Sequence, residues 1–128
     1  MSRIRGKHTK PEMVVRKFLY SNGIRYRLHA TLPGKPDLLV AREIAIFVNG
    51  CFWHCHNGCA ASRIPKTRSE FWRAKLERNV TRDAVNYKKL KDAGLQLLVV
   101  WECELKGTDR DEVLANLYNE IKLRQGKS

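Results

Sequence analysis

The sequence predicts an α/β fold in which a mixed central sheet is flanked by helices. The chain has 128 residues, enough for one hydrophobic core and too few for two, so we expect a single domain over residues 1–128. Short apolar runs of the kind that are buried in sheets alternate with longer segments of helical periodicity. Their order is helix, three strands, long loop, helix, strand, helix, which suits one sheet with helices packed against it.

The first half of the chain supplies one helix and three strands. Thr9-Lys10-Pro11-Glu12 has the form of a capping box, and the apolar residues after it recur at helical spacing until Asn22-Gly23 ends the helix. A Pro-Gly-rich turn at residues 32–36 separates the first two strands. The strands are expected at residues 25–28, 37–40 and 44–48, and the last is a continuous apolar run typical of a buried strand.

The second half begins with an irregular loop at residues 49–66 that is rich in Gly, Cys and His. A second capping box, Thr67-Arg68-Ser69-Glu70, predicts the start of a long helix that runs to Ala93, with Gly94 as its cap. A buried strand at residues 95–101 and an amphipathic helix at residues 109–123 complete the chain.

Positive charge is concentrated in two blocks. The chain has 25 Lys and Arg against 13 Asp and Glu, a net charge of +12. Residues 1–36 and 63–91 carry most of this excess, which is typical of a protein that binds a polyanion, with nucleic acid as the first candidate. The hydrophobic share of 43% argues against a disordered basic tail. The longest apolar run is too short to span a membrane, and no apolar signal region follows the basic N-terminus, which argues against secretion.

Three of the four cysteines lie close to a histidine. Cys51, Cys55, His56 and Cys59 share the loop, and Cys103 follows more than forty residues later. In a chain without a secretion signal, this crowding of Cys and His indicates a metal site, with zinc as the first candidate, before it indicates disulfides. Four ordinary buried thiols are the alternative, since free cysteine is often buried.

Three residues have both a catalytic and a plainer interpretation. Asp37, at the mouth of a strand, suits a hard cation such as Mg²⁺, although an aspartate after such a turn is often only turn chemistry. His54 is either a zinc ligand or a titratable group that reaches a metal-bound phosphate from the same sheet edge. Glu12 needs no catalytic role, because the capping box accounts for it.

The long predicted helix carries its own ambiguities. Asp83 could simply pair with Arg78 or Lys88 on the same helix. Lys75, Arg78 and Arg82 fall three and four apart and, with Arg73 close by, would form a basic stripe that is either solvated or follows DNA phosphates.

Phe52 and Trp53 are two large aromatic residues inside the proposed metal loop. Loops lie at the surface, so burial alone explains such a pair poorly. In a basic protein, an exposed aromatic pair can wedge between stacked base pairs. The alternative is that both rings only cover the metal site.

Several motifs together resemble the very-short-patch repair (Vsr) endonucleases, in order and over essentially the whole chain. The most specific is the string Gly50-Cys51-Phe52-Trp53-His54. The others are Ser2-Arg3-Ile4-Arg5-Gly6-Lys7, Thr9-Lys10-Pro11-Glu12, Pro33-Gly34-Lys35-Pro36-Asp37, Phe47-Val48-Asn49, Pro65 to Trp72, and Trp101-Glu102-Cys103. The resemblance implies a restriction-endonuclease-like core with a structural zinc site. It also implies a Mg²⁺-dependent nick 5′ to the thymine of a T·G mismatch, the product of 5-methylcytosine deamination.

The same resemblance implies a role for individual residues. Asp37 and the backbone carbonyl of Val48 would hold magnesium, His54 would act as general base, Asp83 would orient it, and Glu12 would support the metal's water shell. The zinc ligands would be Cys51, His56, Cys59 and Cys103. The DNA-binding residues would be Met1, Phe52, Trp53, Trp72, Lys75 and Asn79.

The resemblance also implies a partner and a place of action. The partner would be double-stranded DNA with a T·G mismatch, together with proteins of the repair pathway, and the enzyme would be a monomer in the bacterial cytoplasm, at the nucleoid.

The sequence departs from the family pattern in four places. The acidic-x-Lys half of the superfamily's active site is missing, which is itself typical of this family. Asn49 stands where the family often has His, Cys55 competes with His56 as a zinc ligand, and a sequence that begins at Met1 lacks the longer N-terminal arm of relatives. We expect this last difference to weaken the grip on DNA.

Two rival functions remain open on the sequence. One is a restriction-type enzyme of the same fold that cuts a matched sequence, and the other is a zinc-bearing DNA-binding module without catalysis. Asp37, His54 and Asp83 together speak against the second, because binding alone requires no acid, base and orienter.

Overall fold

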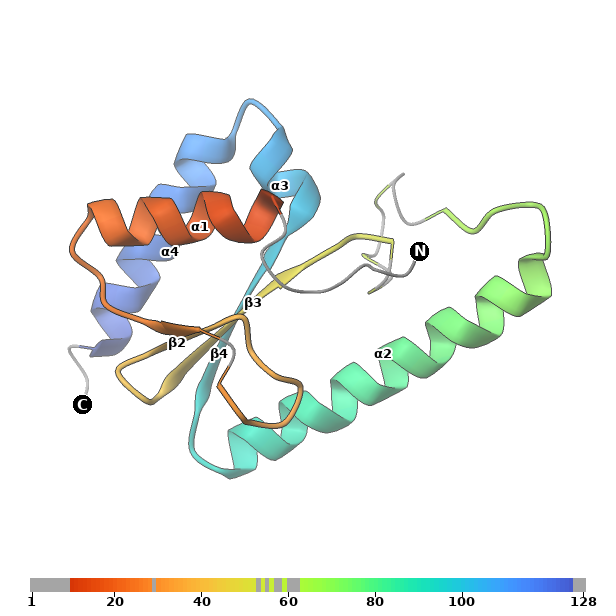
Figure 1. Ribbon diagram of the computed structural model, residues 1–128, viewed down its shortest axis with the longest axis horizontal. Coiled ribbons are helices and arrows are strands. Elements are labelled where there is room, and N and C mark those ends of the chain that lie inside the picture. Colours follow the sequence, from red (N-terminus) through yellow and green to blue (C-terminus); the bar gives the residue numbers. More distant parts are fainter. Residues whose placement is uncertain are drawn as a thin grey trace.

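The structure is a computed structural model that describes residues 10–28, 30–52, 54, 56, 59 and 63–125. Within this part of the chain, a four-stranded mixed sheet carries helices on both faces (Figure 1), as the sequence predicts. The strand order is β1-β2-β3-β4, with antiparallel pairing from β1 to β3 and parallel pairing of β3 with β4. The strands are β1 (Arg27–Leu28), β2 (Leu38–Val40), β3 (Ile44–Asn49) and β4 (Gln96–Trp101).

Four helices cover the two faces of this sheet. They are α1 (Lys10–Ser21), α2 (Ser69–Asp92), α3 (Glu102–Lys106) and α4 (Arg110–Gln125). Side chains of α1, α3 and α4 pack with Ile44 and Ile46 of β3 in one apolar cluster. On the opposite face, Leu90 of α2 packs with Ala45 and Phe47 in a second cluster. The alternation of side chains along a strand thus gives β3 two buried faces, which explains its continuous apolar sequence.

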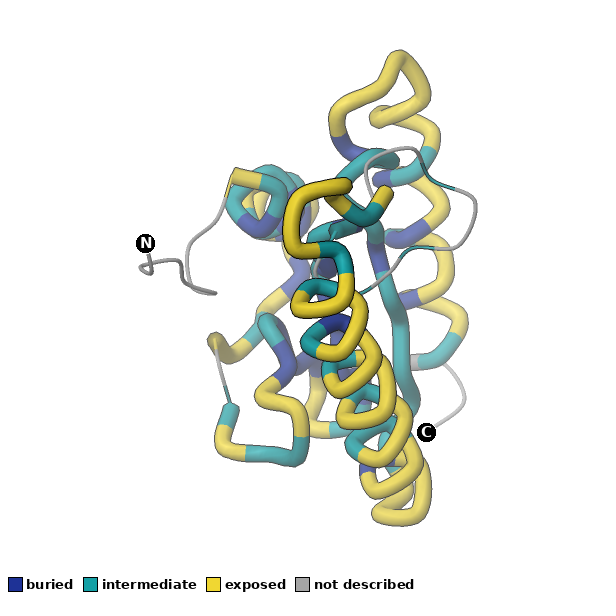
Figure 2. The backbone as a smooth tube through the Cα atoms, turned by 90° about the vertical axis from the view of Figure 1, so that its right-hand side faces the viewer, coloured by how far each residue is buried: buried dark blue, intermediate teal, exposed yellow. Residues whose placement is uncertain are grey.

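The long helix α2 extends well beyond the sheet. Its 24 residues correspond to a length of about 36 Å at 1.5 Å per residue. Its buried residues are Leu76 and Leu90, and Figure 2 shows that most of the helix surface is exposed. The first half of α2 therefore forms an exposed arm beside the carboxyl end of β3, where the candidate site lies (Figure 1).

Most element boundaries lie within two residues of those predicted, with two local differences. The capping box predicted at Thr67 is wrong: the N-cap of α2 is Arg68 in a left-handed conformation (φ 56°), with no side-chain cap hydrogen bond. The short helix α3 was not expected, and its start is stabilised by the Trp101 N–H, which donates to Glu104 Oε1 at 2.9 Å. The predicted role of Gly94 is confirmed by its φ of +92°, which favours glycine just after a helix.

Within the described ranges, no helix has the length and apolar character needed to cross a membrane.

Candidate active site and metal centre

Asp37 is held at the entrance to β2 by a tight turn and by the neighbouring strand. Gly34 in this turn has φ +77°, and a Cβ there would lie 3.1 Å from Asn86 Cβ, so the turn approaches α2 closely. One carboxylate oxygen, Oδ2, accepts a hydrogen bond from the Val48 N–H at 2.7 Å. This bond fixes the carboxylate beside the carboxyl end of β3.

Burial raises the pKa of Asp37 from 3.8 to about 6. The hydrogen bond from Val48 acts in the opposite direction, the negative charge of Glu12 raises the pKa further, and His54 lowers it. Glu12, buried on α1, and His54 in the loop thus both lie within electrostatic reach of Asp37. The structure therefore brings together residues that are far apart in sequence around one carboxylate.

His54 is paired with Asp83 of α2. The distance from His54 Nδ1 to Asp83 Oδ2 is 2.6 Å, and the side chains retain exposed fractions of 29% and 20%. The His54 N–H also donates to the Gly50 carbonyl at 3.2 Å, so the loop turns back on itself at this point. Asp83 therefore contacts His54 across the site, while Lys88, one of its expected helix partners, pairs with Asp92 instead.

This pair has the geometry of a general base with an orienting carboxylate. A carboxylate that accepts a hydrogen bond from Nδ1–H leaves Nε2 of the imidazole with its lone pair, ready to take a proton from water. Because both side chains are partly exposed, a substrate can reach them. Asp37 adds a hard oxygen ligand of the type that Mg²⁺ prefers.

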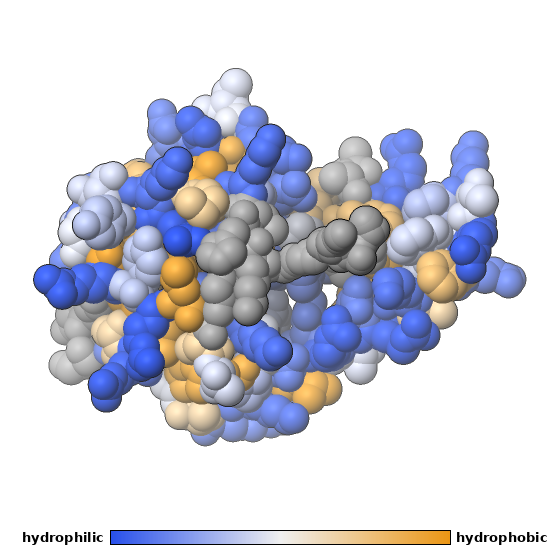
Figure 3. All heavy atoms as spheres, viewed as in Figure 1, coloured by the Kyte–Doolittle hydropathy of each residue, from blue (hydrophilic) through white to orange (hydrophobic). Residues whose placement is uncertain are grey.

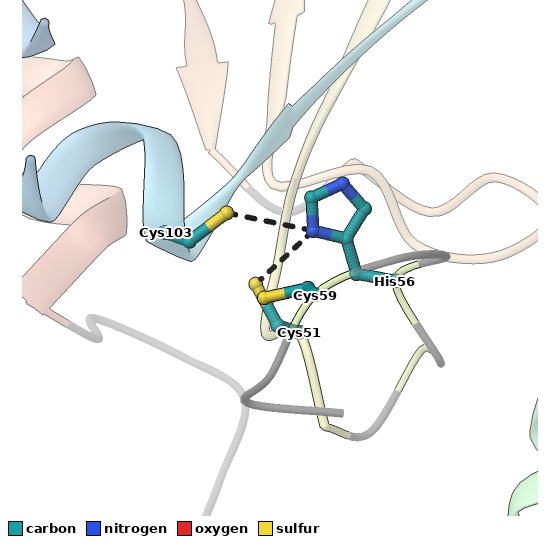
Figure 4. A group of neighbouring side chains, drawn as sticks. All are labelled: Cys51, His56, Cys59 and Cys103. Atoms are coloured by element: carbon teal, nitrogen blue, oxygen red, sulfur yellow. Dashed lines mark hydrogen bonds between the residues drawn. The ribbon is translucent and has the colours of Figure 1, made fainter. Parts of the chain in front are cut away.

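A separate cluster of four side chains has the composition of a metal centre (Figure 4). The ligand atoms of Cys51, His56, Cys59 and Cys103 all lie within 4.8 Å of one another. His56 Nδ1 is 3.5 Å from Cys51 Sγ and 3.4 Å from Cys103 Sγ. A tetrahedral ion with bonds of about 2.0–2.3 Å separates its ligands by roughly 3.5–3.8 Å, so the cluster fits Zn²⁺ with little rearrangement.

The folding of the loop explains why these residues meet. The His56 N–H donates to the Cys51 carbonyl at 2.9 Å, and the Cys59 N–H donates to the His56 carbonyl at 3.2 Å. Two successive turns thus gather three ligands, and α3 contributes Cys103 from the end of the adjacent strand β4 (Figure 4). The Trp101 ring stacks on His56 with centroids 4.2 Å apart and planes 7° apart, which orients the imidazole.

Two thiols of this cluster, those of Cys51 and Cys103, hold their protons more tightly than free cysteine does. Burial, followed by the hydrogen bonds and charges of Cys51 and Cys59, raises the pKa of Cys103 to about 12. Burial also raises the pKa of Cys51. Several thiolates this close together repel one another, and a divalent soft cation removes that repulsion by coordinating them.

Aromatic side chains connect the loop to the arm formed by α2. Phe52 meets Trp72 edge to face with centroids 5.5 Å apart, and Trp72 meets Phe71 in the same way at 5.2 Å. The Arg68 guanidinium lies 4.4 Å from the centroid of Phe71, whose side chain is 44% exposed. The described part of the chain therefore places Phe52 against Trp72, one of the residues predicted to contact DNA.

The basic stripe predicted on α2 faces solvent. Arg73, Arg78 and Arg82 are exposed, and Lys75 is half-buried. Arg82 Nη2 donates to Asn79 Oδ1 at 2.8 Å, which joins a basic residue to one of the predicted groove contacts. Hydrophilic residues cover much of this arm in the view of Figure 3.

Some predicted residues lie outside the described part of the chain. These are the proposed wedge residues Met1 and Trp53, and Cys55, the alternative zinc ligand. The N-cap residue Thr9 of the first predicted capping box lies outside it as well.

Sequence reasoning assigned no role to two residues that the structure places at the site. Asn49 Nδ2 donates to Tyr87 Oη at 3.0 Å, directly beside Asp83 on α2. The spacing of Tyr87, four residues after Asp83, was the available signal, because it puts both side chains on one helical face. Trp101 is a similar case, since only the folded loop brings His56 against it.

The comparisons with a family model and with known proteins agree on one family. The model of the DNA mismatch endonuclease Vsr family matches residues 1–60. The DNA mismatch endonuclease Vsr of Escherichia coli is 37% identical over 132 aligned residues, covering 100% of this chain and 84% of the relative. The type II nicking enzyme V.NmeAIP of Neisseria meningitidis is 42% identical over 95% of this chain and 89% of its own. The type II nicking enzyme V.XorIIP of Xanthomonas oryzae is 45% identical over 82% of this chain and 78% of its own.

Proposed function

The chain belongs to the Vsr family of DNA endonucleases, and from this premise we propose that it nicks DNA 5′ to the thymine of T·G mismatches with the help of Mg²⁺. Its role would be very-short-patch repair after deamination of 5-methylcytosine. The proposed fold class is the restriction-endonuclease-like core, in keeping with the mixed sheet and its flanking helices. The proposed acting unit is the monomer, at the bacterial nucleoid.

The observation that carries this proposal is the 2.6 Å contact of His54 with Asp83 next to the half-buried carboxyl of Asp37. His54 is assigned as the general base that deprotonates the attacking water. Asp83 orients the imidazole and stabilises its protonated form. Glu12 is assigned to the water shell of the metal, since its charge acts on Asp37.

Magnesium is assigned to Asp37 and the backbone carbonyl of Val48. The Val48 peptide is already beside Asp37, although the contact in the structure is made by its N–H. When bound, Mg²⁺ would neutralise charge that develops on the scissile phosphate. The raised pKa of Asp37 supports the assignment, because a partly desolvated carboxylate without a cation is costly.

Zinc is assigned to Cys51, His56, Cys59 and Cys103 as a closed structural site. Its donor set of three thiols and one imidazole is one that Zn²⁺ favours. This zinc site would connect the end of β4 to the loop in which His54 lies. Zinc would thus support catalysis by holding this loop in place, without contacting the reacting atoms.

Recognition of the mismatch is assigned to the aromatic and polar residues beside the site. Phe52 with Trp53 would wedge into the base stack, and a T·G pair would open at lower cost than a matched pair. Trp72 supports Phe52 from α2, as their edge-to-face contact indicates. Lys75 and Asn79 would contact the groove, and Met1 would add a second wedge.

The test compares nicking of three labelled duplexes that differ only at one pair: T·G, T·A and C·G. We expect the T·G duplex to be nicked on the thymine strand and the other two to remain largely intact. Phe52→Ala should reduce the preference for T·G. The control Tyr20→Ala removes an exposed ring from α1 and should leave the preference unchanged. Equal cleavage of T·G and T·A by the wild type would refute the mismatch assignment.

A second candidate function is nicking of a matched recognition sequence. It is favoured by the names of two relatives, which are described as type II nicking enzymes. Sequencing the cleavage positions on a long matched DNA would reveal it as one recurrent site.

A further inference from the structure

The end of β3 is joined to α2 by a partly buried side-chain hydrogen bond. Asn49, only 4% exposed, is the last residue of β3 and donates from Nδ2 to Tyr87 Oη at 3.0 Å. Tyr87 is half-buried on α2, and its ring meets Phe47 edge to face with centroids 5.0 Å apart. Phe47 and Asn49 are two residues apart on one strand, so both point toward α2 and Tyr87 contacts both.

Tyr87 also lies between the two halves of the candidate active site. Asp83 precedes it by one helical turn and holds His54. On the other side, Val48, the neighbour of Asn49, holds Asp37. Burial raises the pKa of the Tyr87 phenol, the hydrogen bond from Asn49 acts in the opposite direction, and the charges of Asp83 and Asp37 raise the pKa further. The phenol therefore keeps its proton at neutral pH, and its oxygen remains a neutral acceptor for Asn49.

We propose that Tyr87 is a positioning residue, whose hydroxyl fixes Asn49 at the end of β3 and thereby sets the distance between the His54–Asp83 pair and Asp37. The inference rests on the proposed function, because it takes these three residues as the catalytic set. It adds a polar anchor that acts through other residues and touches neither the DNA nor a metal ion.

The need for such an anchor follows from how the site is built. Asp37 is attached to the sheet, whereas Asp83 is attached to α2, whose buried residues Leu76 and Leu90 lie seven residues away on either side of it. Leu90 and the Tyr87 ring pack against the sheet through apolar contacts, which are non-directional. The hydrogen bond from Asn49 to Tyr87 adds a directional contact one turn from Asp83. A misplacement of about 1 Å between reacting groups can cost on the order of 100-fold in rate.

The direct test is a double-mutant cycle with Tyr87→Phe, Asn49→Ala and the double variant. Tyr87→Phe removes one oxygen and keeps the ring on Phe47. We expect each single variant to lower the single-turnover nicking rate roughly tenfold to 100-fold, with little change in the Kd for DNA. The double variant should lose no more than the worse single variant, because both changes break the same hydrogen bond.

The matched control is Tyr26→Phe. Its hydroxyl also forms one hydrogen bond, to the Arg16 carbonyl at 3.3 Å, but on the face of the sheet covered by α1. Tyr26→Phe should lower the melting temperature about as much as Tyr87→Phe and leave the nicking rate unchanged. Equal rate losses in the two variants would show a general stability effect and overturn the proposal.

A readout independent of cleavage separates this inference from the proposed function. The side-chain amide signals of Asn49 in NMR spectra should move in Tyr87→Phe and stay in place in Tyr26→Phe. Rates are measured on whichever duplex the wild type nicks, so that a failed mismatch preference leaves the comparison intact. Wild-type nicking by Tyr87→Phe, additive losses in the cycle, or unmoved Asn49 signals would each overturn the role of Tyr87.

Discussion

Replacing Asp37 by Asn should stabilise the protein while it abolishes nicking. In the folded state, burial raises the pKa of this carboxyl to about 6, from 3.8 for an accessible aspartate. The folded state therefore holds the proton more tightly than the unfolded state does. The stability linked to this group is complete below pH 3.8 and is lost as the pH rises through 6.

The size of the change in stability follows from the raised pKa of Asp37. About two pKa units at 1.36 kcal/mol each amount to roughly 3 kcal/mol of lost stability at pH 7.5. Asn is neutral at every pH, and its side-chain carbonyl can still accept the Val48 N–H. Asp37→Asn should therefore raise the free energy of unfolding by up to about 3 kcal/mol at pH 7.5 and by about half as much at pH 5.

The assay is urea denaturation of both proteins at the two pH values, without added magnesium and without a chelator. Omitting the chelator leaves the Cys/His cluster undisturbed. Asp92→Asn is the control, because Asp92 forms an exposed pair with Lys88 that is worth about 0–1 kcal/mol at most. A variant no more stable than the wild type at pH 7.5, or a gain that does not shrink at pH 5, would refute the reasoning.

Three further predictions concern the metal cluster, the base and the charge. Cys103→Ser should lower the zinc content from about one ion per chain and destabilise the fold; elemental analysis with a thermal melt checks this, and an unchanged metal content would contradict it. His54→Ala should slow single-turnover nicking by about 10²–10⁴-fold with zinc content unchanged, whereas loss of zinc would make His54 a ligand. DNA affinity, measured by fluorescence anisotropy, should fall about 10³-fold between roughly 50 and 200 mM salt if six phosphates are contacted. An affinity that is insensitive to salt would exclude contacts between the exposed arginines of α2 and the DNA phosphates.

The helices and strands could largely be predicted, because their signals are local. The continuous apolar run at residues 44–48 predicts a doubly buried strand, and the structure confirms it with packing on both faces. The capping box at Thr67 failed for a local reason as well: Arg68 adopts a left-handed conformation and stacks on Phe71, an arrangement that the four-residue pattern does not encode.

The candidate site also has features that local sequence signals predict and features that depend on the fold. The metal cluster could be inferred from crowded residues in one loop, and the resemblance supplied Cys103 from beyond it. The pairing of His54 with Asp83 also depended on the resemblance, because periodicity alone offered Asp83 two partners on its own helix. Neither the sequence pattern nor the family resemblance predicted the Asn49–Tyr87 hydrogen bond, because it depends on how α2 crosses the end of β3.

The wide sequence separation within the metal cluster has a consequence for synthesis of the chain. His56 and Cys103 are 47 positions apart, and His54 and Asp83 are 29 apart. Contacts of such separation form only after the intervening segment is available, and closing that loop costs entropy. While the ribosome is still extending the chain, the loop that carries His54 therefore lacks its last anchor until Cys103 has emerged. A nascent or truncated chain that ends before Cys103 would accordingly be unable to assemble the complete Cys/His cluster.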